Sequence, residues 1–258
     1  MSQAHQRISD AIHAANAAGR TGLVPFITAG YPDKNAFIET LCSVASAGDV
    51  VEVGVPFSDP MADGITIQRS SHAAIEAGVS LRWILKELIA AGDVGAPLVL
   101  MSYLNPLLAY GYEALAADAL KAGVCGFIVP DLPLEEGDEL RAALAAKGLA
   151  LIQLVTPATP DERIERLCAA SQGFVYAVTI KGITGGAQAI PPEVTGYLDK
   201  VRKAAGAVPV CAGFGVREAA QLQSLGAHAQ GVIVGSALVE QLEAGNDPVA
   251  FLEALRPG

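Results

Sequence analysis

The segment VVEVGVPFSDPMADG spans residues 50–64 and opens with an apolar run that contains one carboxylate, Glu52, among valines. A short run rich in β-branched residues predicts a buried strand. Side chains alternate along a strand, so Glu52 points to one face while the valines on either side of it point to the other. An ionised Glu is rarely buried unless it is paired. The segment therefore predicts a strand with one apolar face and one face that accommodates a carboxylate.

The pattern of an apolar strand followed by an amphipathic helix recurs along the whole chain. Strands are predicted over residues 22–30, 50–55, 96–103, 124–130, 149–155, 173–180, 208–215 and 231–239. Apolar strands alternating with helices are typical of a parallel sheet covered by helices. Eight units without a break, and no G-x-G-x-x-G after the first strand, favour a closed barrel over an open doubly wound sheet. We expect an α/β fold, a single (β/α)₈ TIM barrel over residues 1–258 with an extra N-terminal helix.

The composition narrows the classes of partner. Hydrophobic residues make up 52% of the chain and charged residues 17%, which is enough apolar material for a large core. A formal net charge of −10, without a cluster of Lys and Arg, argues against a nucleic-acid or anionic-membrane surface. No apolar run approaches the roughly 18 residues that a membrane span needs. We therefore expect a cytoplasmic protein with no nucleic-acid and no membrane partner.

A barrel of this type places its chemistry at the carboxyl ends of the strands. With the valines facing the helices, Glu52 faces the mouth of the barrel; with the faces reversed, it would instead pair with a helix Lys or Arg. The loop PFSDPMADG after this strand carries Asp59 and Asp63, and Asp, Pro and Gly also favour turns on their own account. Two carboxyl groups in different environments are the usual equipment for moving protons.

Other catalytic groups are badly placed. None of the four histidines follows a strand directly, which argues against a His-based triad and against a metal site. Lys181, just beyond the sixth strand, is placed to form a Schiff base, although a solvated loop lysine is the simpler interpretation. The proton chemistry therefore falls to carboxylates.

Glycines follow the last three strands. They lie in KGITGG (181–186), AGFGVRE (212–218) and VGSALVE (234–240). In barrels of this type the final loops and the start of a short helix often form a phosphate site, because backbone N–H groups approach the anion and the helix dipole favours it. The segments predict a phosphorylated substrate.

Five segments in this order resemble the tryptophan synthase α subunit family: VEVGVPFSDPMADG, VPDLPLEE (129–136), YAVTIKGITGG (176–186), CAGFGV (211–216) and VGSA (234–237). The resemblance covers essentially the whole chain, and the PFSDP-x-ADG loop is its most specific part. It implies a lyase that cleaves indole-3-glycerol phosphate to indole and glyceraldehyde 3-phosphate by a retro-aldol reaction, with no cofactor in this chain. It also implies an α₂β₂ heterotetramer, in which a pyridoxal-phosphate-dependent β subunit uses the indole to make tryptophan.

The same resemblance assigns roles to single residues. Glu52 takes the place of the catalytic acid and base, and Asp63 that of the group that holds the indole N–H. The phosphate ligands fall on Gly185, Gly215, Gly235 and Ser236. The pocket or its closing loop falls on Phe26, Leu100, Tyr176 and Thr184, and Asp131 takes the place of a residue that communicates with the partner. The chain departs from the family pattern at Ile65, where many members have proline, and at residues 179–181, where many have other polar or basic residues.

Three alternatives stay open at this point. The chain could be a stand-alone indole-3-glycerol-phosphate lyase, another phosphate-binding aldolase that uses Lys181, or a catalytically weak allosteric partner of the β subunit. Retention of both Glu52 and Asp63 weighs against the last.

The apolar end of the strand should raise the pKa of Glu52, because desolvation disfavours the charged form. A raised pKa suits a carboxyl group that must both give and take a proton near neutral pH.

Overall fold

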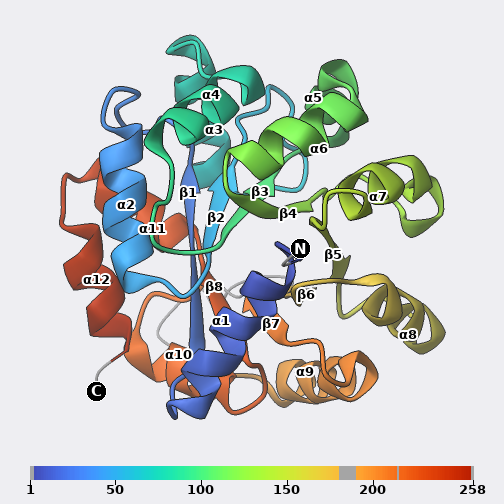
Figure 1. Cartoon of the computed structure of the whole chain (residues 1–258). Helices are drawn as coiled ribbons and strands as arrows, with labels where there is room; N and C mark the ends of the chain where they lie inside the picture. The colour runs from blue at the N-terminus through green and yellow to red at the C-terminus, as the bar shows by residue number, and fades with distance from the viewer. Residues whose placement is uncertain (1–2, 180–189, 214, 257–258) are drawn as a thin grey trace.

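Eight parallel strands form a closed barrel in which the order in space follows the order in sequence. The computed structural model describes residues 3–179, 190–213 and 215–256. The strands are β1 (Gly22–Thr28), β2 (Val51–Gly54), β3 (Leu98–Met101), β4 (Val124–Ile128), β5 (Ala150–Val155), β6 (Val175–Val178), β7 (Val210–Gly213) and β8 (Gly231–Val234). Pairing of β8 with β1 closes the sheet. The predicted TIM barrel is confirmed, and Figure 1 shows the helices arranged around it.

The predicted extra N-terminal helix precedes β1, and helices follow each strand, as the alternating pattern predicts. They are α1 (Gln6–Ala17), α2 (Phe37–Ala47), α3 (Ile65–Glu76), α4 (Leu81–Ala91), α5 (Leu104–Tyr110), α6 (Tyr112–Lys121), the 3₁₀ helix η1 (Leu134–Glu136), α7 (Asp138–Ala145), α8 (Asp161–Ala170), α9 (Pro192–Ala205), α10 (Ala219–Gly226), α11 (Ser236–Glu243) and α12 (Pro248–Leu255). Within the described part of the chain, no helix is both long and apolar enough to cross a membrane.

The eighth strand is shorter than the sequence predicts. The apolar run to residue 239 suggests one long strand, but β8 ends at Val234. Gly235 has φ −108° and ψ −88°, which is outside the strand region, and its carbonyl oxygen accepts the N–H of Val239 at 3.0 Å. The chain therefore turns directly into α11, and the N-terminus of this helix lies at the carboxyl end of the barrel.

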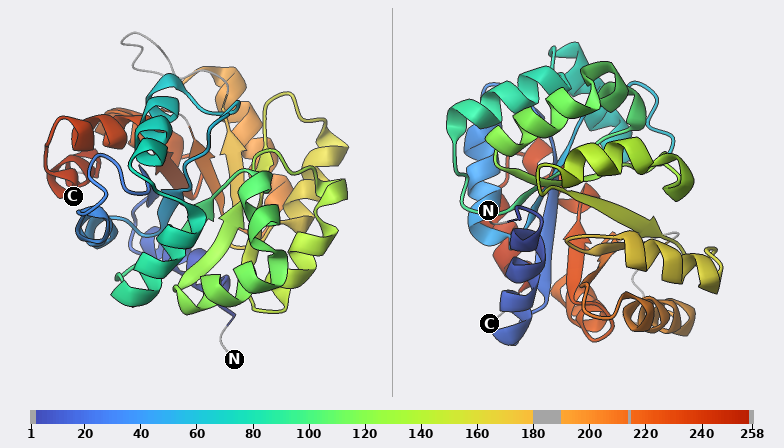
Figure 2. Two further views of the ribbon diagram at one scale, coloured as in Figure 1. Left: turned by 90° about the horizontal axis from the view of Figure 1, so that it is seen from above. Right: turned by 45° about the vertical axis from the view of Figure 1, so that its right-hand side comes forward.

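Two apolar layers hold the barrel together. The larger lies between the strands and the surrounding helices, and the smaller fills the inside of the barrel together with α1. Ile8 and Ile12 of α1 are fully buried, and Gly173 leaves room for Ile8, since a Cβ there would lie 3.0 Å from Ile8 Cδ1. Because α1 packs against residues at the starts of the strands, it closes that end. The views in Figure 2 show the barrel and its helices from two further sides. The opposite end of the barrel holds a cavity.

Candidate active site

Glu52 points into the barrel. On β2, Val51 and Val53 belong to the outer apolar layer, while Glu52 is 1% exposed and lines an internal cavity. It lies level with Phe26 of β1 and Val99 of β3. The predicted orientation is confirmed, and the alternative in which Glu52 pairs with a helix cation is wrong. The flanking valines fix this result, because they match the apolar layer under the helices and leave the other face to Glu52.

Few groups among the described residues stabilise the ionised form of the Glu52 carboxyl group. Its Oε2 atom is buried and has no hydrogen-bond partner among the described residues. Burial raises the pKa of Glu52 to about 8, and the nearby Asp63 carboxylate adds to the rise. Desolvation and a like charge both disfavour the ionised form. A carboxyl group with such a pKa is mostly protonated at neutral pH, so it is able to give a proton and take it back.

Asp63 reaches the same cavity from the loop between β2 and α3. Its Oδ2 accepts a hydrogen bond from the hydroxyl of Tyr103 at 3.2 Å. The hydroxyl oxygen of Tyr103 in turn accepts a hydrogen bond from the N–H of Ala62 at 2.9 Å. The ring of Tyr103 stacks on Phe57, with ring centroids 4.8 Å apart. Burial raises the pKa of Asp63, and the bond from Tyr103 opposes the rise. Tyr103 therefore holds the Asp63 loop against the end of the neighbouring strand.

The cavity between these groups has a volume of about 220 Å³ and lies at the carboxyl ends of the strands. Phe26 and Tyr176 form part of its wall. Both rings depend on glycines: a Cβ at Gly54 would lie 2.5 Å from the Phe26 ring, and one at Gly213 would lie 2.8 Å from the Tyr176 ring. Burial, with the carboxyl groups nearby, holds the pKa of Tyr176 well above its usual value, so its hydroxyl stays neutral.

The start of a helix lies on the opposite side of the cavity. Gly235 and Ser236 line it at the start of α11, together with Gly215, which has φ +66°. The first N–H groups of a helix have no partner within the helix and point outward, so they bind anions. The N-cap Gly235 makes no side-chain cap that would compete for them. This geometry agrees with a phosphate site at the predicted positions 215, 235 and 236.

Three predicted site residues lie elsewhere or beyond the described part of the chain. Leu100 is fully buried in the outer apolar layer, so the prediction that it lines the pocket is wrong; its neighbour Met101 lines the cavity instead. The reason is the alternation along β3, which turns successive side chains to opposite faces. The predicted Thr184 and Gly185, and also Lys181, lie outside the described residues.

Asp131 lies outside the barrel mouth, on the loop after β4. Its Oδ1 accepts the N–H of Leu104 at 2.9 Å, which ties this loop to the start of α5. Asp131 also lines a second cavity of about 320 Å³, between α7 and α8. The two cavities share Pro130 and Leu154 as part of their walls.

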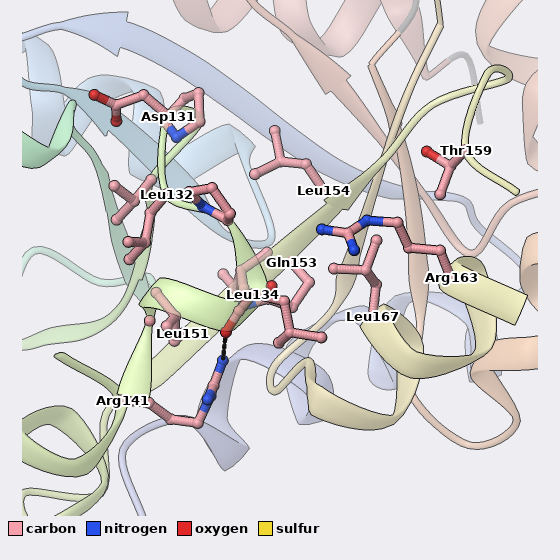
Figure 3. A pocket seen from close by; sticks show the side chains of 15 residues that line it. Asp131, Leu132, Leu134, Arg141, Leu151, Gln153, Leu154, Thr159, Arg163 and Leu167 are labelled. Atoms are coloured by element: carbon pink, nitrogen blue, oxygen red, sulfur yellow. Dashed lines mark hydrogen bonds between the residues drawn. The ribbon is translucent and has the colours of Figure 1, made fainter. Parts of the chain in front are cut away.

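Arginines enter the second cavity from its two sides, Arg141 from α7 and Arg163 from α8, as Figure 3 shows. Each of them is paired. Arg163 Nη1 and Nη2 donate to the two oxygens of Glu135 at 2.8 and 3.0 Å, and Arg141 Nη1 donates to Asp138 at 2.7 Å. Among the described side chains that line this cavity, Nε of Arg141 is the one atom that is buried without a hydrogen-bond partner. This cavity is larger than the one in the barrel mouth, but both of its arginines are paired with carboxylates.

Comparison with known proteins gives the family. The family model described as "Tryptophan synthase alpha chain" matches residues 12–255. The chain belongs to the tryptophan synthase alpha chain family. The tryptophan synthase alpha chains of Nitratidesulfovibrio vulgaris strain Hildenborough and Desulfovibrio desulfuricans are 46% and 47% identical to it, over 96% and 95% of this chain and 97% of each relative.

Solved structures agree with the membership of the tryptophan synthase alpha chain family. A chain of the aminoacrylate-bound tryptophan synthase from M. tuberculosis superposes with a TM-score of 0.87 at 37% identity, over 96% of this chain and 97% of that one. The tryptophan synthase alpha chain from Legionella pneumophila gives a TM-score of 0.85 at 31% identity, over 97% and 95% of the two chains. Membership of the family implies a lyase. Within the described residues, no group of three or more His, Cys, Asp or Glu side chains is arranged to hold a metal ion.

Proposed function

We propose that this chain cleaves indole-3-glycerol phosphate to indole and glyceraldehyde 3-phosphate. The observation that carries the proposal is the buried carboxyl group of Glu52, whose Oε2 has no hydrogen-bond partner among the described residues and which shares one cavity with Asp63 and with the start of α11. The three features match the three parts of this substrate: the bond to be broken, the indole ring and the phosphate.

The reaction moves one proton and breaks one carbon–carbon bond. Glu52, protonated near neutral pH because of its raised pKa, gives a proton to carbon 3 of the indole ring. Asp63 accepts the ring N–H and stabilises the positive charge that develops on the ring. Glu52, now ionised, takes the proton of the hydroxyl on the adjacent side-chain carbon. The carbon–carbon bond then breaks, its electrons return to the ring as indole leaves, and the hydroxyl carbon becomes the aldehyde.

The phosphate and the ring fix the position of the reacting carbon. The N–H groups at the start of α11 and beside Gly215 receive the phosphate, and Phe26 and Tyr176 receive the ring. Gly185 and Thr184 complete the phosphate site and the closing loop by family resemblance alone. Binding energy gained at the phosphate holds the reacting bond against Glu52, which lowers the entropic part of the barrier.

The natural state of the protein in this proposal is a complex with a tryptophan synthase β subunit, which holds the pyridoxal phosphate and uses the indole. Large exposed apolar side chains in the segments that follow β2 and β3 support a partner there: Met61 in the loop after β2 is 93% exposed, Ile65 at the start of α3 80% and Leu108 in α5 51%. Exposed apolar side chains that gather on one face mark interaction sites. Asp131 belongs to the same end of the barrel and is the proposed point of communication.

An assay of indole release from indole-3-glycerol phosphate, with and without β subunit, tests the proposal. We expect slow release by the isolated chain and faster release by the complex, because docking should favour closed loops over the substrate. Equal rates, at concentrations where sedimentation shows a complex, would point to a stand-alone lyase. Borohydride trapping with substrate should capture nothing; a covalent adduct at Lys181 would replace carboxylate chemistry with a Schiff base.

A further inference from the structure

A carboxylate outside the cavity links three segments of the site. Glu240 on α11 accepts a hydrogen bond from the hydroxyl of Thr66, in the first turn of α3, with 3.1 Å between Thr66 Oγ1 and Glu240 Oε1. Arg217 donates to both oxygens of the same carboxylate, at 2.6 Å from Nη1 and 3.0 Å from Nη2. A bidentate Arg–carboxylate contact fixes the orientation of the two groups as well as the distance between them. Glu240 is therefore the centre of a bridge between α3, α11 and the segment after β7.

Each partner of Glu240 lies within three residues of a residue that lines the cavity. Thr66 lies three residues after Asp63, and Arg217 lies two residues after Gly215. Glu240 itself lies one helical turn, about 6 Å, along α11 from the first residue of that helix. The bridge thus joins the segment that presents the Asp63 carboxylate to both segments that line the anion-binding side of the cavity.

A second bridge holds the same two helices farther from the cavity. Glu243 accepts hydrogen bonds from the hydroxyl of Tyr31 at 2.8 Å and from Nε of Arg69 at 3.1 Å. Arg69 belongs to α3 and Glu243 to the end of α11, so the two helices remain joined when the contact at Glu240 is removed. Substitutions around Glu240 therefore test local placement and leave the packing of α3 on α11 in place.

Arg217 has a second consequence for the site. A carboxylate one turn along α11 repels an anion bound at the start of this helix, and salt screens such a repulsion over about 8 Å at physiological ionic strength. The guanidinium of Arg217 is in direct contact with that carboxylate and offsets its charge. The ion pair therefore allows α11 to carry Glu240 without weakening the anion site.

We propose that Glu240 is a positioning residue, which with Thr66 and Arg217 holds the Asp63 segment in register with the phosphate-binding segments. The role presupposes the indole-releasing activity proposed above. It predicts that the two contacts of Glu240 affect different kinetic constants. Loss of the Thr66 contact misplaces Asp63 and lowers kcat, whereas loss of Arg217 exposes the charge of Glu240 to the phosphate and raises KM.

The first arm of the test compares Thr66→Val with Thr66→Ser, because only the serine keeps the donor to Glu240. We expect the valine variant to lose about tenfold in kcat for indole-3-glycerol phosphate, with KM within about twofold of the serine variant, since small misplacements cost up to about 10²-fold. Equal kcat for the two variants, with an active wild-type chain, would overturn the role of the bridge. An inactive wild-type chain would instead overturn the proposed function, and this inference with it.

The second arm measures charge. Arg217→Met should raise KM, and the dissociation constant of glycerol 3-phosphate, about fivefold at low salt, and the rise should shrink at high salt. Adding Glu240→Gln to this variant removes the unpaired carboxylate and should bring both constants back toward the wild-type values. Binding of glycerol 3-phosphate by calorimetry needs no turnover, so it reports on the anion site alone. A KM that is unchanged in the single variant, or not restored in the double variant, would overturn the inference.

Discussion

The cavity in the barrel mouth and the cavity between α7 and α8 lie side by side but differ in whether their charged side chains are paired. In the larger cavity, about 320 Å³, Arg163 is paired with Glu135 and Arg141 with Asp138. In the smaller one, about 220 Å³, Glu52 is buried without a counter-charge among the described residues, and the Asp63 carboxylate that acts on it has the same sign. A buried carboxyl group without a partner is costly, and groups with strongly shifted pKa values cluster at functional sites. The pairing of charged side chains, more than the volume of the cavity, distinguishes the candidate site from the neighbouring cavity.

The largest effect is expected at Glu52. Glu52→Gln keeps the shape of the side chain and removes the transferable proton, so kcat for indole release should fall by about 10²–10⁴-fold, the usual worth of general acid–base catalysis. Binding of glycerol 3-phosphate, measured by calorimetry, should be unchanged, because the proposed phosphate contacts are on the other side of the cavity. A variant that keeps more than about a tenth of the wild-type kcat would remove Glu52 from the mechanism.

The same substitution should reveal the cost of the unpaired carboxyl group. The pKa of Glu52 is about 8 in the folded chain against an ordinary value of 4.5, so folding favours the protonated form. Its stabilising contribution is complete below pH 4.5 and is lost as the pH rises through 8. Gln does not titrate, so the stability of the wild type relative to Glu52→Gln should fall by a few kcal/mol between these limits, at ~1.4 kcal/mol per pKa unit. Urea denaturation of both proteins across this range measures it, and a pH-independent difference would mean that Glu52 is compensated.

The anion side of the same cavity gives the next effect. Ser236→Asp places a carboxylate at the start of α11, where the phosphate is expected, and should raise KM for indole-3-glycerol phosphate at least about tenfold. Asp is favourable near a helix N-terminus, so the variant should stay folded. Ser80→Asp is the matched control, because Ser80 caps the start of α4 outside the cavity and Asp also serves as an N-cap. If the two aspartates gave the same KM, the phosphate site would lie elsewhere.

The sequence predicts the features of this comparison that depend on local patterns. Alternation of strand and helix gives the barrel, and the valines beside Glu52 give its orientation, because both follow from which face is apolar. Leu100 shows the limit of assigning pocket residues from sequence. A shift of one residue along a strand moves a side chain to the other face, and Met101 lines the cavity in place of Leu100. Tyr103 carries no local signal, because its bond to Asp63 joins two loops that are 40 residues apart in sequence.

The smallest effect is expected in the larger cavity, and it is the sharpest check on the comparison. Arg141→Met keeps an apolar stem against the leucines of the wall and removes a guanidinium whose Nε is buried without a partner among the described residues. It also removes the contact with Asp138, but that carboxylate is 86% exposed, so the pair contributes little. The lost pair and the removed unpaired donor act in opposite directions, so the free energy of unfolding should change by less than about 1 kcal/mol. Indole release should keep its kcat and KM within about twofold, because no step of the reaction uses this cavity. A substantial loss of kcat in a variant that unfolds normally would show that the compensated cavity takes part in the chemistry, and charge compensation would then no longer separate the two regions.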